Sequence, residues 1–188
     1  HFYPPMKKIL YISYDGILEP LGQSQVLAYQ EILAKNHQIF LISFEKTSFN
    51  KANNFHCETE DRILNSGIRW YRLRYHKAPS GIATFYDLVV GGALSFFLIC
   101  RFKISVIHAR SYVPSVIALT LKNLLNVKFI FDMRGFWADE RVDGNIWHPQ
   151  SKMYRLAKWF EKKFITNADH IVSLTHAALN TINNFPYI

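Results

Sequence analysis

The chain has 188 residues, a length typical of one domain rather than two full ones. Its 22 Lys and Arg outnumber its 14 Asp and Glu, so the net charge is +8. Hydrophobic residues make up 49% of the chain and charged residues 19%, which excludes a disordered chain, and 8 Gly and 7 Pro exclude a fibrous one. The 2 cysteines exclude a fold built on several disulfides.

The excess of cations favours an anionic partner: a nucleic acid, an anionic lipid or a phosphorylated small molecule. The sequence has no helix-turn-helix signal and no basic-aromatic sheet motif of RNA readers, so we expect no nucleic acid as a partner.

The ends of the chain and one apolar segment bear on its location. We interpret Met6 as the native start, so residues 1–5 are expected to be an added segment, and no signal peptide follows. Residues 82–100 are mostly apolar but include Asp87, and the uninterrupted apolar run at 88–100 is too short for a membrane span. We expect a buried or half-buried helix there, with contact at a membrane surface as the alternative.

Short apolar runs that predict strands alternate with runs of helical periodicity along the whole chain. In the first half these are a strand at 8–13, a helix at 24–34, a strand at 37–44, a turn-like segment at 46–54, a helix at 55–65 ending before Gly67, a strand at 68–75 and a helix at 84–102. In the second half they are a strand at 105–109, a helix at 114–125, a strand at 127–132, a loop at 133–150, a helix at 151–165 capped by Ser151, a strand at 170–174 and a helix from the cap Thr175 to Asn183. This alternation predicts an α/β fold, a doubly wound and mostly parallel Rossmann-like sheet with helices on both faces.

Ligands of such sheets bind at the carboxyl ends of the strands, so the loops that follow strands are the candidates. The first, residues 14–25, contains Asp15 and the run Gly22, Gln23 and Ser24 before a helix. Backbone N–H groups beside a glycine at a helix start can hold a phosphate. The loop matches neither nucleotide-binding glycine motif, and an ordinary long connection is the alternative.

The other two loops carry cations and carboxylates. His108 and Arg110 follow the fourth strand, where they form either an anion or hydroxyl site or simply hydrogen-bonded structure. The third loop, 132–149, suits sugar hydroxyls and phosphates through its charged side chains, unless these pair with one another. Its candidates are Arg134, Asp139, Glu140 and Arg141, together with two tryptophans, Trp137 and Trp147.

No metal-binding constellation stands out among the scattered histidines and isolated cysteines, so we expect neither a metal nor another cofactor. The helix at 151–165 is basic and amphipathic, with Lys152, Arg155, Lys158, Lys162 and Lys163 beside Met153, Leu156, Phe160 and Phe164. Two interpretations stay open for it: contact with an anionic membrane surface, or a sheet-facing apolar side with solvated lysines.

Four segments together resemble the N-terminal domain of the family 4 (group 1) glycosyltransferases of GT-B fold, most closely members that build bacterial surface polysaccharides. They are KKILYISYDG…LGQSQ, IHARS, FIFDMRGFWADERVDG…W and ADHIVSLT. The similarity covers most of the chain from Met6 onward, and DMRGFWADER is its most specific part. The family commonly has a glycine pair in the first loop, where this sequence has Leu21 and Gly22.

The resemblance implies that residues 6–188 are the acceptor-side domain of a metal-independent retaining enzyme. A C-terminal domain outside this chain would bind the nucleotide-sugar donor and carry the donor-side glutamates, so this chain alone is expected to be inactive. Gly22, Gln23 and Ser24 would approach the donor diphosphate. The acceptor, a saccharide or a lipid-phosphate-linked one, would meet Asp15, His108, Arg110, Arg134, Asp139, Glu140 and Arg141.

The expected location is the cytoplasm, with peripheral contact at the inner face of the cytoplasmic membrane. The alternative to an enzyme is a stand-alone, non-catalytic Rossmann-like module that binds a phosphorylated ligand or a partner.

Overall fold

The structure, a computed structural model, describes residues 6–46 and 54–187. Residues 1–5, interpreted above as an added segment, and most of the turn expected at 46–54 lie outside the described residues. The chain divides into two compact units, residues 1–107 and 108–188, with the boundary inside the fourth strand.

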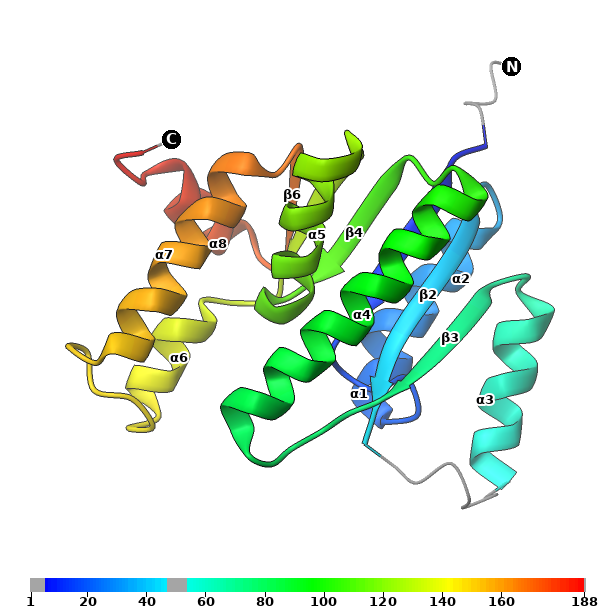
Figure 1. The fold of residues 1–188 in the computed structure, drawn as a ribbon, viewed down its shortest axis with the longest axis horizontal. Helices are drawn as coiled ribbons and strands as arrows, with labels where there is room; N and C mark the ends of the chain where they lie inside the picture. Colours follow the sequence, from blue (N-terminus) through cyan, green and yellow to red (C-terminus); the bar gives the residue numbers. More distant parts are fainter. Residues whose placement is uncertain (1–5, 47–53, 188) are drawn as a thin grey trace. The chain divides into compact units, whose positions relative to one another are not determined.

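The described strands form a six-stranded parallel sheet in the order β3-β2-β1-β4-β5-β6, as the Rossmann-like prediction requires (Figure 1). They are β1 (Lys8–Ser13), β2 (Gln38–Glu45), β3 (Arg69–Arg74), β4 (Val106–Arg110), β5 (Lys128–Met133) and β6 (His170–Ser173). Each strand begins and ends within one residue of its predicted limits. β1 and β2 are almost wholly buried, as continuous apolar runs in a parallel sheet predict.

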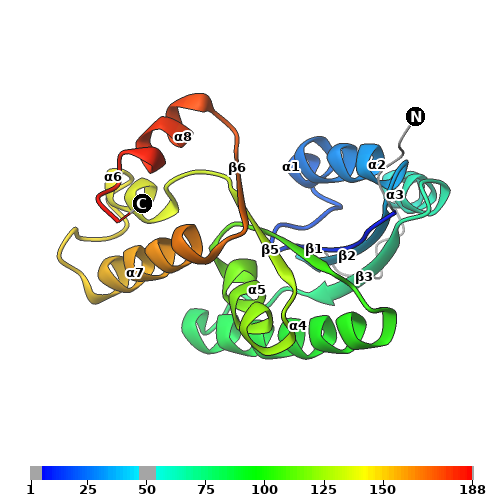
Figure 2. The same cartoon turned by 90° about the horizontal axis from the view of Figure 1, so that it is seen from above.

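In the first unit, helices cover both faces of the strands (Figure 2). The unit contains α1 (Pro20–Gly22), η1 (Gln23–Leu27), α2 (Ala28–Ala34), α3 (Asn54–Asn65) and α4 (Ser80–Phe102). Figure 2 shows α4 on one face and the other helices on the opposite face. Gly67 follows α3 with φ +72°, the left-handed conformation expected for it there.

In the second unit, α5 packs on β5 and on α7, α6 packs on α7, and α8 packs on β6. The helices are α5 (Tyr112–Leu125), α6 (Trp137–Asp143), α7 (Lys152–Asn167) and α8 (His176–Asn183). The predicted caps are confirmed, since Ser151 Oγ accepts the Tyr154 N–H and Thr175 Oγ1 accepts the Ala178 N–H.

Two local predictions were wrong. The first helix begins at Pro20 rather than Ser24, because proline at a first helical position is compatible with helix and α1, η1 and α2 run on without a break to Ala34. The loop predicted at 133–150 contains α6, whose first turn carries the acidic pair Asp139 and Glu140. Carboxylates in a first turn stabilise a helix through its dipole, and this signal was overlooked.

Gly22 lies inside the helical segment and lets its first turn touch the preceding loop. A Cβ atom at Gly22 would collide with the carbonyl oxygen of Gly16 and lie 2.9 Å from the Cα of Ile17. Both clashing atoms belong to the backbone, which has little freedom to move away. The absence of a side chain at Gly22 therefore fixes how the loop after β1 meets its helix.

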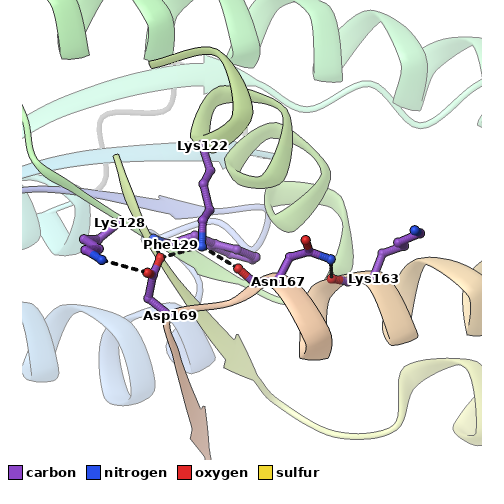
Figure 3. Close-up of polar contacts among 6 residues, drawn as sticks. All are labelled: Lys122, Lys128, Phe129, Lys163, Asn167 and Asp169. Atoms are coloured by element: carbon purple, nitrogen blue, oxygen red, sulfur yellow. Dashed lines mark hydrogen bonds and ion pairs between the residues drawn. The ribbon is translucent and has the colours of Figure 1, made fainter. Parts of the chain in front are cut away.

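The carboxylate of Asp169 joins α5 and β5 to the short connection between α7 and β6 (Figure 3). It accepts hydrogen bonds from Lys122 Nζ at 2.8 Å, from Lys128 Nζ at 3.1 Å and from the Phe129 N–H at 2.8 Å. Burial alone would raise the pKa of Asp169, but these hydrogen bonds outweigh it and hold the pKa well below its usual range.

The first prediction concerns Gly22. Gly22→Ala should lower the free energy of unfolding by about 1–3 kcal/mol, because the methyl group overpacks against backbone. Gly92→Ala in α4 is the control, since a Cβ there meets nothing within 4 Å and alanine favours helix by up to about 1 kcal/mol. Urea unfolding measures both, and equal stability of the two variants would contradict the packing role of Gly22.

The second prediction concerns how the stability of the fold depends on pH through Asp169. A carboxylate whose folded pKa is depressed stabilises the fold above its unfolded pKa, about 3.9, and this stability is lost as the pH falls below it. Asp169→Asn should cost about 1–3 kcal/mol at neutral pH and reduce the acid dependence of the melting temperature. Asp143→Asn, at an exposed carboxylate, should leave both unchanged. A variant at Asp169 that melts like the parent at every pH would refute this role.

Candidate functional site

Three polar side chains meet at the carboxyl ends of β4 and β5, all inside the second unit. Asp132 Oδ2 lies 3.3 Å from Arg110 Nη1 and 3.6 Å from His108 Nε2. All three are buried, with exposed side-chain fractions of 3% for His108 and Arg110 and 8% for Asp132. Removing one partner of such a buried pair leaves an uncompensated charge, at a cost of about 3–5 kcal/mol. The sequence placed His108 and Arg110 here, but it did not single out Asp132 as their partner.

The chain turns sharply directly after this cluster. Ser111 has φ +68°, a conformation that a residue with a side chain rarely adopts. Its N–H donates to the Asp132 carbonyl oxygen at 2.9 Å, and its own carbonyl oxygen accepts the Ser115 hydroxyl at 2.6 Å. The strained residue is thus held between β5 and the first turn of α5, as is common beside functional sites.

Asp139 faces α7. Its carboxylate accepts a hydrogen bond from Tyr154 Oη at 2.7 Å and forms an ion pair with Lys158 Nζ at 2.8 Å. Lys158 also contacts Glu161, which is fully buried and accepts the hydroxyl of Tyr112. One alternative for the third loop was that its charged side chains pair within the protein, and Asp139 does so. Contact between Asp139 and an acceptor stays a prediction.

The pKa values in this network shift as its charges require. Burial, with the neighbouring Glu161, raises the pKa of Tyr112, so this hydroxyl stays protonated and donates. Burial would lower the pKa of Lys158, but its bonds to Asp139 and Glu161 raise it above the ordinary value. Because the Tyr112 hydroxyl stays protonated and Lys158 stays charged, the network holds α5, α6 and α7 together rather than transferring a proton.

The remaining charged candidates of the third loop are accessible. Arg134 and Glu140 are exposed, and the Glu140 carboxylate packs over Gly135, where a Cβ atom would collide with it. Arg141 is partly exposed, with its guanidinium carbon 5.3 Å from the Trp137 ring centre. Arg134 and Glu140 are the candidates best placed to reach a ligand in solution.

The two tryptophans pack against protein. Trp137 meets Trp147 edge to face, with ring centres 4.9 Å apart, and Tyr112 at 5.3 Å. Such edge-to-face contacts are typical of aromatic side chains that pack within the protein.

In the first unit, most of the first-loop candidates already have partners. Gln23 Nε2 donates to Thr59 Oγ1 at 2.8 Å, and Ser24 Oγ donates to the Pro20 carbonyl at 3.0 Å. The carbonyl of Asp15 accepts the Ser13 hydroxyl at 2.9 Å. The assignment of Gly22, Gln23 and Ser24 to a donor diphosphate stays a prediction.

The same loop is held by a residue that the sequence reasoning missed. Glu45, 2% exposed at the end of β2, accepts the N–H groups of Ile17 at 2.8 Å and Leu18 at 3.2 Å. It also accepts the Ser43 hydroxyl at 2.5 Å. An acidic residue that ends a buried apolar strand is the signal that could have revealed it.

A second missed cluster joins β1, β3 and α4. Asp87, 1% exposed, accepts Tyr14 Oη at 2.9 Å and lies 2.6 Å from His76 Nδ1. Burial and the hydrogen bond to Asp87 raise the pKa of Tyr14. Asp87 is the one acidic residue in the apolar helix α4, and its position there was the signal that the sequence offered. Among the described residues, no group of three His, Cys, Asp or Glu could hold a metal ion.

Comparison with solved structures agrees on the fold. Sucrose-phosphate synthase from Thermosynechococcus elongatus superposes with a TM-score of 0.66 at 12% identity, over 95% of this chain and 45% of that one. Phytolacca americana UGT2, solved with UDP-2fluoro-glucose and pterostilbene, gives 0.66 at 11%, over 100% and 53%. Acinetobacter baumannii MurG gives 0.53 at 10%, over 96% and 43%. The chain thus spans about half the length of these proteins, and such low identities establish the fold alone.

No curated protein sequence matches the chain significantly. A family model, by contrast, matches residues 28–185, which is most of the chain and includes the cluster at His108, Arg110 and Asp132. The chain belongs to the family of glycosyl transferase 4-like domains.

Proposed function

We propose that this domain binds the acceptor in a retaining glycosyltransferase. The enzyme moves a sugar from a nucleotide-sugar donor to a saccharide or lipid-linked acceptor, and we place it in bacterial cell-surface polysaccharide synthesis. The observation that carries the proposal is the buried cluster of His108, Arg110 and Asp132, inside the matched family region and at the carboxyl ends of two parallel strands.

The chemistry of transfer suits the residues around this cluster. The acceptor hydroxyl oxygen bonds to the anomeric carbon as the bond from that carbon to the diphosphate breaks, and the hydroxyl proton passes to the leaving phosphate. Retention requires attack on the face from which the diphosphate leaves. Cations oriented in advance stabilise the developing negative charge. Arg110 is oriented by Asp132, and Arg134 stands at the surface one residue beyond β5.

Carboxylates of the same loop suit the sugar. A carboxylate can accept two hydroxyl hydrogen bonds, and Glu140 is exposed, whereas the Asp139 carboxylate is engaged by α7. We therefore assign hydroxyl recognition first to Glu140, with Asp139 fixing the helix that carries it. Arg141 in the second unit and Asp15 in the first are further proposed acceptor contacts.

The donor would be bound by a second domain, because this chain spans about half the length of the solved structures it matches. In that arrangement the residues Gly22, Gln23 and Ser24 approach the donor diphosphate, and this chain alone does not turn over. The enzyme works in the cytoplasm at the inner face of the membrane, needs no metal, and does not bind nucleic acid.

The third prediction tests the third loop in the enzyme that carries both domains. Arg134→Ala and Glu140→Ala should each lower kcat/KM by about a hundredfold, because each removes a group that contacts the reacting sugars or phosphate. Arg155→Ala, at an exposed arginine on α7, is the matched control and should keep the parent rate.

Unchanged circular dichroism and melting temperature would show that the two variants still fold. Rates near the parent value in both would remove this loop from the mechanism. Anomeric NMR of the product tests retention separately.

A further inference from the structure

Helix α4 exposes a continuous apolar stripe. Six large side chains recur at helical spacing along it and are each between 46% and 71% exposed. They are Ile82, Phe85, Tyr86, Val89, Phe96 and Phe97. Single exposed apolar residues are ordinary on protein surfaces, whereas an uninterrupted stripe of this length marks an interaction surface.

The opposite side of α4 is fixed to the first unit, so the stripe cannot turn inward. Asp87 is buried between Tyr14 and His76, and its carboxylate oxygen Oδ2 also accepts the backbone N–H of His76 at 3.1 Å. Ala83 and Leu98 are buried on the same side, and α4 contacts β1. Rotating the helix to hide the stripe would expose the apolar residues and break the bonds of Asp87.

The helix is long and apolar enough to cross a membrane, since an 18-residue stretch within Gly81–Phe102 has a mean hydropathy of 1.9. Here, however, it is the connection between β3 and β4, and it lies along a face of the first unit's strands (Figure 2). Crossing a bilayer would carry the ion-paired Asp87 into hydrocarbon without its partners. The geometry favours a helix that lies in the plane of a surface.

The charges beside the stripe are all of one sign. From Arg74 to Lys103 the one acidic residue is Asp87, which is buried and paired. The exposed charged residues are Arg74 and Lys77 before the helix and Arg101 and Lys103 at its end. The stripe therefore has cations at both of its ends.

We propose that α4 docks this domain on an anionic lipid bilayer. The six apolar side chains enter the boundary between headgroups and acyl chains, and the flanking cations bind lipid phosphates. A second copy of the chain fits less well, because antiparallel α4 helices would bring cations against cations, and residues 74–103 have no exposed acid to pair them. The inference concerns the location of the domain and does not rest on the proposed reaction.

The test is binding of the chain to vesicles. Cosedimentation with vesicles of equal parts phosphatidylglycerol and phosphatidylcholine should show binding that weakens with added salt, as screening requires. Vesicles of phosphatidylcholine alone should bind much less. The double variant Phe85→Ser/Phe97→Ser should bind the anionic vesicles at least roughly tenfold more weakly.

Two variants keep the test specific. Leu64→Ser, at a 75% exposed leucine on α3, is the matched apolar control and should bind like the parent. Arg101→Gln/Lys103→Gln should weaken binding to anionic vesicles alone. Circular dichroism would verify that each variant folds.

The basic helix α7 is the competing surface. Its exposed face carries Lys152, Arg155, Lys162 and Lys163 beside Met153, Leu156 and Trp159. Loss of vesicle binding in Lys162→Gln/Lys163→Gln, with normal binding in Phe85→Ser/Phe97→Ser, would overturn the proposal. The proposal would also be overturned if the parent chain did not bind vesicles but formed a dimer in analytical ultracentrifugation, and if the two phenylalanine substitutions dissociated that dimer.

Discussion

A buried carboxylate at the end of β5 is the interaction on which the candidate site depends. Asp132 sits within ion-pair reach of Arg110 and His108, and its carbonyl oxygen also anchors the strained Ser111. Where water is excluded, this carboxylate compensates the buried charge of Arg110, and the backbone carbonyl of the same residue holds the turn. The end of β4, the start of α5 and the end of β5 are thereby set by one residue.

The second unit is also stabilised by its polar network away from that cluster. The chain Tyr112–Glu161–Lys158–Asp139 links α5, α7 and α6, and every member is engaged in at least one bond. Such a network is costly to bury unless it is satisfied throughout, and a satisfied one specifies a single arrangement. It gives the exposed pair Arg134 and Glu140 a rigid support, although α6 is only 7 residues long.

The strands could be predicted from the sequence because a strand buried on both faces needs a continuous run of apolar residues, as in β2. The caps at Ser151 and Thr175 were predictable for an equally local reason, since a hydroxyl before a helix has few other uses. Neither α6 nor the start of the first helix at Pro20 was predicted, because short helices have too few residues for a periodic pattern. Most partners of Glu45, Asp87 and Asp132 could not be predicted, since those bonds join residues 22 to 73 positions apart in the chain.

The same limit explains why the sequence left two interpretations of α4 open, a buried or half-buried helix and a helix in contact with a membrane surface. Composition alone described residues 82–100 as apolar, which fits a core helix as well as a surface one. The buried Asp87 decides between them, because its bonds to Tyr14 and His76 fix which side of the helix faces the sheet. Asp87 is therefore also the residue that leaves the aromatic side chains of α4 facing outward.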